Sequence, residues 1–151
     1  MPPNTAPRHP EPHVARVIAL FEGLQPADLA RLGDFYAADA RFKDPFNDVT
    51  GLAAVARVYG HMFEALGTPR FTVLQAIGSG ADVVLTWDFD FRLGRRPLRI
   101  HGASHLVFDV GGRIVLHRDY WDAAEELYAK LPWLGVLMRA LQRRLATPLS
   151  D

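Results

Sequence analysis

The stretch that decides the fold is DVVLTWDFDFRL, residues 82–93. From Leu85 onward, large apolar side chains alternate with polar ones. Because side chains two residues apart on a β-strand share a face, this alternation predicts a strand with one apolar face. That face carries the aromatic rings of Trp87, Phe89 and Phe91, so we expect it to border the interior of the protein.

Similar strands are predicted on both sides of this one. Glycine-containing turns are expected at 78–80, 94–96 and 111–112, and turns of that length join antiparallel neighbours. The flanking strands are expected at 70–77, 97–110 and 113–121. The second half of the chain therefore predicts an antiparallel meander of four strands.

The first half of the chain has a helical period instead. Apolar residues recur at helical spacing over 13–24 and again over 51–66, and a short helix is expected at 27–33. A strand within 35–43 ends at Asp44-Pro45, because proline cannot donate to a β-ladder. Helices segregated from a meander are typical of the α+β class.

Length predicts one domain, since 151 residues are enough for a single core. We expect the domain to span residues 13–146. Residues 1–12 contain five prolines and are predicted to form a disordered tail. Residues 147–151 are expected to be a second, short tail.

Composition excludes several classes of protein. Lys plus Arg and Asp plus Glu both number 17, which argues against a nucleic-acid partner, and cysteine is absent, which rules out disulfides and thiol chemistry. No signal peptide or membrane span is predicted, so a cytoplasmic location is expected. Neither metal-ligand spacing nor a nucleotide motif occurs, so we expect no metal and no cofactor.

Two sets of residues are candidates for chemistry. His117, Asp119 and Trp121 share one face of a strand, which is typical of a pocket wall but equally of a structural ion pair at a strand end. Asp44 ends a strand before a proline and has two interpretations as well. It is a general base if it faces a pocket, or a turn cap if its carboxylate only binds local amides.

These segments resemble a known superfamily. Residues 35–45, Gly51 at a helix start and the ending 117–122 are similar to the nuclear-transport-factor-2-like superfamily, which includes ketosteroid isomerases, SnoaL-like polyketide cyclases and scytalone dehydratase. The resemblance covers about residues 13–125. It implies a curved antiparallel sheet that forms a cone, closed by N-terminal helices around an apolar pocket, with a C-terminal helix added.

The resemblance also implies a site. Its expected catalytic residues are Asp44, His117 and Asp119, with Asp44 at the position of the isomerases' general base. The residues expected to contact a small hydrophobic ligand are Tyr36, Tyr59, Phe63, Trp87, Phe89, Ser104 and Trp121. The two positions that form the isomerases' oxyanion site fall on Leu20 and Ser104, so genuine ketosteroid isomerisation is not expected.

Two functions follow. One is an acid–base enzyme of the isomerase, cyclase or dehydratase type with Asp44 as general base, and the other is a non-catalytic ligand-binding or dimerising module. Residues 133–145 form an amphipathic segment whose apolar side has three alternative partners: the chain's own sheet, a second copy of the chain, or a membrane surface. We expect a homodimer.

Overall fold

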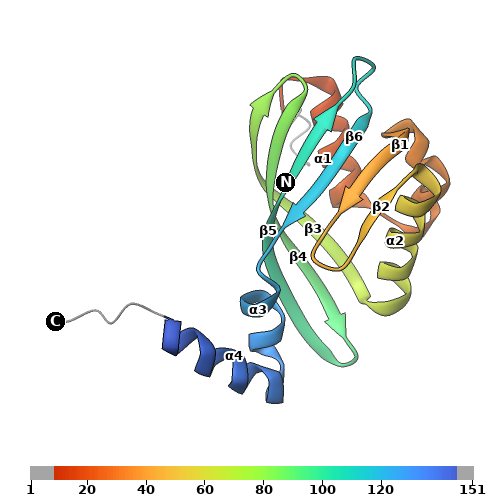
Figure 1. The fold of residues 1–151 in the computed structure, drawn as a ribbon. Coiled ribbons are helices and arrows are strands. Elements are labelled where there is room, and N and C mark those ends of the chain that lie inside the picture. The colour runs from red at the N-terminus through yellow and green to blue at the C-terminus, as the bar shows by residue number, and fades with distance from the viewer. Residues whose placement is uncertain (1–8, 146–151) are drawn as a thin grey trace, which may run out of the picture.

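The computed structural model describes residues 9–145 and contains one six-stranded sheet (Figure 1), in the order β2-β1-β6-β5-β4-β3. The strands are β1 (Tyr36–Lys43), β2 (Asp48–Thr50), β3 (Gly67–Ser79), β4 (Asp82–Leu93), β5 (Arg96–Phe108) and β6 (Ile114–Tyr120). The helices are α1 (Pro12–Gly23), α2 (Leu52–Ala65), α3 (Ala123–Glu126) and α4 (Pro132–Leu145), with short 3₁₀ helices η1 (Pro26–Asp34) and η2 (Tyr128–Lys130).

The predicted meander is present as β3-β4-β5-β6, with antiparallel pairing throughout. Gly80, Gly94 and Gly112 have positive φ in its three turns, where glycine has no steric cost. β3 begins earlier than expected, directly after α2, and includes Pro69. Because β3 lies at the edge of the sheet, a proline there need not interrupt the pairing with β4.

The sheet is not purely antiparallel. β1 pairs with β6 in parallel, which places Phe42 beside His117. The sequence did not predict this pairing, nor the short strand β2 that forms a hairpin with β1. The parallel contact extends the meander with β1 and β2 and brings Asp44, just after β1, to the end of β6.

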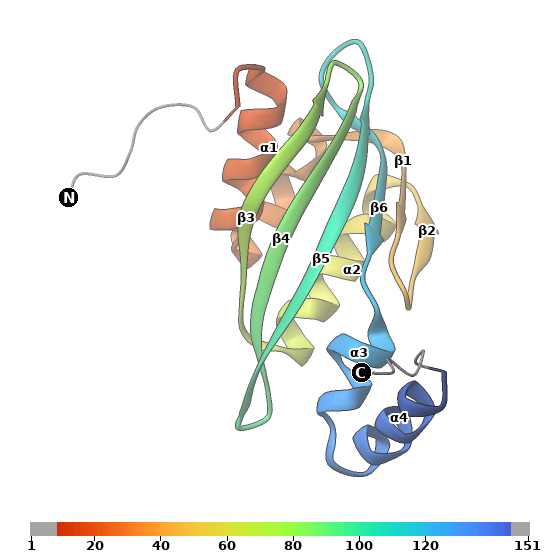
Figure 2. The same ribbon diagram turned by 90° about the vertical axis from the view of Figure 1, so that its left-hand side faces the viewer.

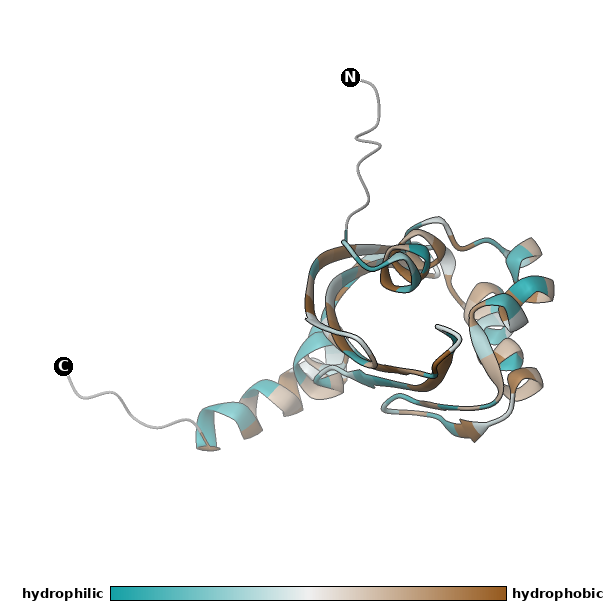
Figure 3. Ribbon diagram, turned by 90° about the horizontal axis from the view of Figure 1, so that it is seen from above, coloured by the Kyte–Doolittle hydropathy of each residue, from teal (hydrophilic) through white to brown (hydrophobic). Residues whose placement is uncertain are grey.

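Helices α1 and α2 lie across the open side of the curved sheet (Figure 3). α1 packs against β3, and α2 packs against β1 and also contacts β3. The buried faces of both helices are apolar, with Val17, Ile18 and Phe21 on α1 and Val55 and Tyr59 on α2. The α+β class and the curved sheet predicted from the sequence are confirmed.

The folded part of the chain begins before residue 13. α1 starts at Pro12, whose fixed φ suits the first helical position. The carboxylate of Glu11 accepts hydrogen bonds of 2.9 and 3.0 Å from the amide of Gly80, and His9 is buried. Residues 9–12 of the predicted tail are thus attached to the β3–β4 turn. Its remainder, 1–8, and the predicted tail at 147–151 lie outside the described residues.

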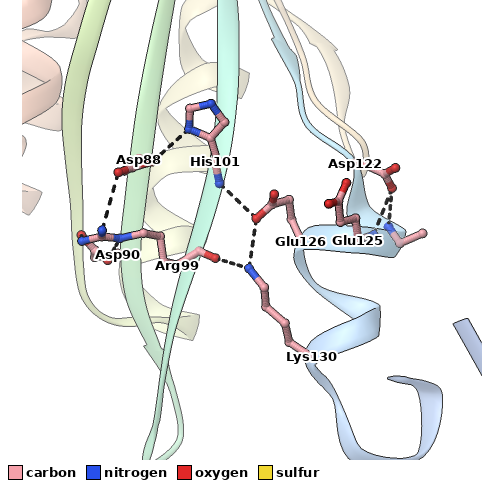
Figure 4. A network of polar contacts seen from close by, with 9 residues as sticks. Asp88, Asp90, Arg99, His101, Asp122, Glu125, Glu126 and Lys130 are labelled. Atoms are coloured by element: carbon pink, nitrogen blue, oxygen red, sulfur yellow. Dashed lines mark hydrogen bonds and ion pairs between the residues drawn. The ribbon is translucent and has the colours of Figure 1, made fainter. Parts of the chain in front are cut away.

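After β6 the chain turns onto the edge of β5 (Figure 4). The Glu126 carboxylate accepts a hydrogen bond of 3.2 Å from the amide of His101, and Lys130 donates one of 2.6 Å to the carbonyl of Arg99. An ion pair of 3.0 Å joins Lys130 to Glu126. These side chains form hydrogen bonds with backbone groups of β5 that lie beyond the reach of β6. They thereby cover a part of the β5 edge that would otherwise be unpaired.

The C-terminal helix α4 extends away from the sheet (Figure 2). It contacts η2, whereas several of its apolar side chains point to solvent: Trp133 is 92% exposed and Leu137 61% exposed. The alternative in which α4 buries its apolar side against its own sheet is therefore wrong. No helix within residues 9–145 is long and apolar enough to cross a membrane.

Candidate functional site

The concave face of the sheet encloses a cavity of about 280 Å³ between β4, β5, β6 and α2. Its walls are mostly apolar, and aromatic rings are the commonest lining group. The lining residues are Phe21, Phe42, Asp44, Phe46, Asn47, Val58, Tyr59, His61, Met62, Ala65, Leu66, Phe71, Val73, Trp87, Phe89, Phe91, Leu93, Ile100, Ser104, His117, Asp119, Trp121 and Leu127. An apolar cavity with a few polar groups is the usual form of a small-molecule site.

Asp119 is at the centre of the polar groups in this cavity. It pairs directly with Ser104 across β5 and β6, and its Oδ1 accepts a hydrogen bond of 2.5 Å from the Ser104 hydroxyl. His117 lies two residues earlier on the same strand, with Nε2 2.8 Å from the same oxygen. Trp87 donates from Nε1 to the Ser104 hydroxyl at 2.8 Å. The strand register thus brings four side chains into one connected network.

The network continues behind His117 to two tyrosines. Nδ1 of His117 lies 2.7 Å from the hydroxyl of Tyr36, which lies 2.8 Å from the hydroxyl of Tyr59. The imidazole is held by aromatic rings: Phe42 contacts it edge-on at a centroid distance of 4.8 Å, and Phe21 lies 5.4 Å away. His117 is consequently 4% exposed and fixed at both nitrogens.

The protonation state of His117 determines the direction of these bonds. With Nε2 protonated alone, His117 donates to Asp119, and Nδ1 accepts from Tyr36, which in turn accepts from Tyr59. With both nitrogens protonated, Nδ1 donates to Tyr36, Tyr36 donates to Tyr59, and the Tyr59 hydrogen is free for the cavity. Each ring nitrogen and hydroxyl oxygen of the network has a hydrogen-bond partner in both arrangements. Protonation of His117 therefore reverses the two bonds behind it and turns the Tyr59 hydroxyl into a donor toward the cavity.

Burial raises the pKa of both tyrosines. For Tyr36, the loss of water around the phenol is the largest cause, and the neighbouring Tyr59 adds to it. For Tyr59, burial again raises the pKa most, and the nearby charges of Asp119 and Asp44 raise it further. Both phenols therefore remain neutral hydrogen-bonding groups, and both carboxylates lie close enough to act on Tyr59.

Asp44 borders the cavity but also caps a turn. Its Oδ1 accepts hydrogen bonds from the amides of Phe46 and Asn47 at 2.7 and 2.6 Å, and the Asn47 side chain donates to both of its oxygens. This is the turn-capping arrangement that the sequence left open. Oδ2 receives the single Asn47 bond and keeps a lone pair for a ligand.

Most of the residues predicted for the site lie at the cavity, and two do not. Tyr36 lies behind His117 and reaches the cavity through it. Phe63 does not line the cavity but borders an adjoining hollow, beside Leu24 and Pro26. Tyr59 and Met62 carry the cavity-facing side of α2, and the helical turn of about 100° per residue moves Phe63 to its flank. Those predicted residues that line the cavity are Asp44, Tyr59, Trp87, Phe89, Ser104, His117, Asp119 and Trp121.

Sequence reasoning missed the contact that Gly102 makes with Trp87, and it missed two residues at the mouth. Gly102 lies opposite Trp87 in the sheet, and a Cβ at Gly102 would lie 2.5 Å from the indole ring. A glycine inside a strand signals such a close approach, so this role was detectable. At the mouth, Phe46 contacts the Trp121 ring edge-on at 5.6 Å, and His61 is exposed there. No pattern in the sequence singled out Phe46 or His61.

A metal site is not formed by the part of the chain that the structure describes. Within residues 9–145, no three His, Asp or Glu side chains come close enough together to hold a metal ion. His101 and His105, which share a strand, turn outward and pair with Asp88 and Asp82 at 3.0 and 2.9 Å.

The fold is shared with structures of several named proteins. A protein with a ketosteroid-isomerase-like fold from Catenulispora acidiphila, solved with trimethylamine, has 21% identity and a TM-score of 0.68, covering 80% of this chain and 94% of that one. An epoxide hydrolase from M. tuberculosis has 20% identity and a TM-score of 0.66, covering 91% and 95%. A putative SnoaL-like polyketide cyclase from Shewanella putrefaciens has 18% identity and a TM-score of 0.62, covering 76% and 93%.

A comparison with curated proteins finds no match. The model of the SnoaL-like domain, in contrast, matches residues 17–117, which include the second half of α1, all of α2, the first five strands and the start of β6. The match spans two thirds of the chain and agrees with the curved sheet and its enclosed cavity. The chain therefore belongs to the SnoaL-like domain family.

Proposed function

We propose that this protein binds a small hydrophobic molecule in its cavity and acts on it by acid–base chemistry, as an isomerase, cyclase or dehydratase. The observation that carries the proposal is the His117–Asp119 pair, with 2.8 Å between Nε2 and Oδ1, inside an aromatic cavity. A carboxylate and an imidazole in hydrogen-bond contact, shielded from bulk water, are the usual means of moving a proton at neutral pH. Relatives of this fold named as a cyclase and an epoxide hydrolase support a catalytic role.

Three groups have roles in the proposed reaction. Asp119 accepts a proton from a carbon next to a substrate carbonyl, because its Oδ1 is held by Ser104 and His117 while Oδ2 has no partner among the described residues. Tyr59 donates to the substrate oxygen when His117 is protonated. Asp44, which the sequence predicted as the general base, is the alternative proton acceptor, and Oδ2 is the atom that would take the proton.

The same contacts argue against ketosteroid isomerisation. Leu20 is buried in the core and has no polar group to offer an enolate. The Ser104 hydroxyl gives its hydrogen to Asp119 and so cannot donate it to a substrate. Both positions of the isomerases' oxyanion site are therefore without a free donor, and such donors typically supply a rate factor of about 100 to 1000.

Deuterium exchange tests the proposal without the natural substrate. A small aromatic ketone such as 2-tetralone is incubated with the protein in D₂O, and loss of its α-protons is followed by NMR. We expect exchange above the buffer rate and a loss of about 100-fold or more in Asp119→Asn. If Asp44→Asn loses exchange instead and Asp119→Asn keeps it, Asp44 is the base.

One outcome favours the binding module. If 2-tetralone shifts the NMR signals of the protein but exchanges no faster than in buffer, the cavity binds without catalysing. His117→Gln tests the imidazole, because glutamine keeps a hydrogen-bonding side chain of similar length but cannot take up a proton. Circular dichroism of each variant establishes that it is folded before its exchange rate is compared.

A small amine is a further ligand to test. One protein of this fold was solved in complex with trimethylamine. That ligand belongs to the Catenulispora protein, and for the present chain it suggests only that amines belong in the ligand screen.

A further inference from the structure

The charges around the cavity are unbalanced. Two carboxylates, Asp44 and Asp119, line it, and no Lys or Arg side chain of the described chain does. If His117 is protonated, the three groups together still carry a net negative charge. His61 is the one other lining residue able to become cationic, and it lies at the exposed mouth rather than inside.

The nearest basic side chains do not correct this imbalance. Lys43 and Arg118 border a neighbouring hollow that shares Asp44 and Asp119 with the cavity. Lys43 is already paired with Asp48 at 3.2 Å. Arg118 is directed over the ring of Tyr120, with 4.7 Å between its guanidinium carbon and the ring centroid, and does not line the cavity.

The hydrogen-bond network leaves acceptors, and few donors, for a ligand. The indole of Trp87 donates to Ser104, and Ser104 donates to Asp119. With His117 neutral, its own N–H is used on Asp119, and the hydroxyl of Tyr59 is used on Tyr36. Within this network, the groups that remain for a ligand are then the oxygen of Tyr59 and the Oδ2 atom of Asp119. Outside it, Oδ2 of Asp44, the side-chain oxygen of Asn47 and the imidazole of His61 at the mouth also border the cavity.

Oδ2 of Asp119 is the most available of these acceptors. It has no hydrogen-bond partner among residues 9–145, although the Asp119 side chain is only 13% exposed. No side-chain nitrogen or oxygen in that part of the chain is both fully buried and without a partner, so Oδ2 must border open space. The open space beside Asp119 is the cavity and the adjoining hollow.

Aromatic rings make up much of the remaining wall. Nine Phe, Tyr and Trp side chains line the cavity, and Phe46 and Trp121 meet at its mouth with ring centroids 5.6 Å apart. The face of an aromatic ring attracts a cation, most strongly when the cation is weakly hydrated and removed from water. An anion meets the opposite conditions here, because two carboxylates repel it and no fixed cation compensates.

We infer that the ligand of this cavity carries an apolar ammonium group, such as a tertiary amine, held between the aromatic rings and the carboxylates of Asp119 and Asp44. The inference rests on one part of the proposed function, namely that a small ligand binds in this cavity. It narrows the substrate class from any hydrophobic carbonyl compound to one that bears a basic nitrogen.

Three probes that share a benzyl group test the inference. N,N-dimethylbenzylamine is cationic at pH 7, benzyl methyl ether is neutral, and phenylacetate is anionic. Each is titrated into the full chain, and binding is followed by isothermal calorimetry together with the fluorescence of Trp87 and Trp121, which line the cavity. We expect the amine to bind about tenfold or more tightly than the ether, and phenylacetate to bind most weakly.

Matched variants assign the effect to the cavity. Asp119→Asn and Asp44→Asn should each weaken amine binding several-fold and leave ether binding unchanged, because they remove charge but little volume. Asp39→Asn removes an equal charge from an exposed position of β1 outside the cavity and should change neither. If one cavity variant does not fold, the other provides the same comparison.

The outcomes separate this inference from the proposed function. If the ether or phenylacetate binds as tightly as the amine, the inference is overturned, and the cavity remains a site for neutral or anionic molecules. If the Asn variants leave amine affinity unchanged, the carboxylates do not hold the ligand and the inference fails as well. If none of the three probes binds, a small-molecule site in this cavity is itself contradicted.

Discussion

At the scale of single residues, the two tyrosines behind the cavity make stability sensitive to alkaline pH. Tyr36 and Tyr59 are buried with their hydroxyls 2.8 Å apart, and burial raises the pKa of each above the ordinary value near 10. The unfolded chain releases these protons at that ordinary value, whereas the folded chain keeps them. Their contribution to stability is therefore complete below pH 10 and is lost progressively as the pH rises above it.

The measurement is a tyrosine titration by absorbance at 295 nm in a variant with Tyr120→Phe and Tyr128→Phe, which leaves only the buried pair. We expect phenolate absorbance to appear together with the loss of circular dichroism as the pH rises. Phenolate absorbance near pH 10 with an intact dichroism spectrum would show that the pair is accessible in the folded state.

Alternation along the strands grouped the residues that share a face, and the resemblance to the superfamily indicated which face is turned to the interior. Ser104, His117 and Asp119 were all assigned to the inner face, and they lie there. Their bonding was beyond prediction, because the contact between Ser104 and Asp119 depends on the register of β5 against β6. Register depends on the whole sheet and not on either strand alone. The bonds of Asp44 are local, by contrast, and its turn-capping role was among the predicted alternatives.

At the scale of elements, the α4 helix explains why a homodimer is expected. Leu137, Leu141 and Leu145 are exposed on this helix, and large apolar side chains at helical spacing usually pack against a partner. The chain's own sheet does not cover them, which leaves a second copy or a membrane surface. We predict that a second copy of the chain covers this face.

Light scattering coupled to size exclusion tests the dimer. The unmodified chain should elute as a dimer, and Leu137→Glu with Leu141→Glu should give a monomer with unchanged circular dichroism. The matched control Arg143→Glu with Arg144→Glu alters two exposed basic residues of α4 and should stay dimeric. A monomer at high concentration, combined with sedimentation alongside anionic vesicles, would favour the membrane surface instead.

The pairing of β1 with β6 could not be predicted from sequence patterns. Short turns identify antiparallel neighbours, because the two strands are adjacent in the chain. A parallel pair between the first and last strands has no turn and no local signal. The resemblance to the superfamily implied a cone, and the structure shows that this contact joins β1 and β2 to the meander.

At the scale of the whole molecule, the four meander strands and the two main helices were predicted from local periodicity, whereas their assembly into a cone was implied only by the resemblance to the superfamily. Helical and strand periods are properties of short windows, so they survive without tertiary context. The extended α4 and the position of Phe63 depend on which surfaces meet across the fold. Like the pairing of β1 with β6, these two features could not be predicted from local patterns.

The contact between β1 and β6 has a consequence for synthesis of the protein. Phe42 leaves the ribosome long before His117, its partner in the sheet, so β1 must wait for β6 with its edge unpaired. Contacts between distant parts of a chain close late and slowly. We predict that during that interval the aromatic face of β4 is incompletely covered on a nascent chain that lacks β6, and that the incomplete protein is therefore prone to aggregate.

Truncation measures this dependence. A chain that ends at Val110 should be unfolded and prone to aggregate, whereas one that ends at Leu131 lacks only α4 and the residues beyond it and should fold. Far-UV circular dichroism and dispersion of the amide NMR signals distinguish the two. A well-dispersed spectrum from the shorter chain would mean that the growing protein can fold before β6 is made. The late synthesis of β6 would then not delay folding.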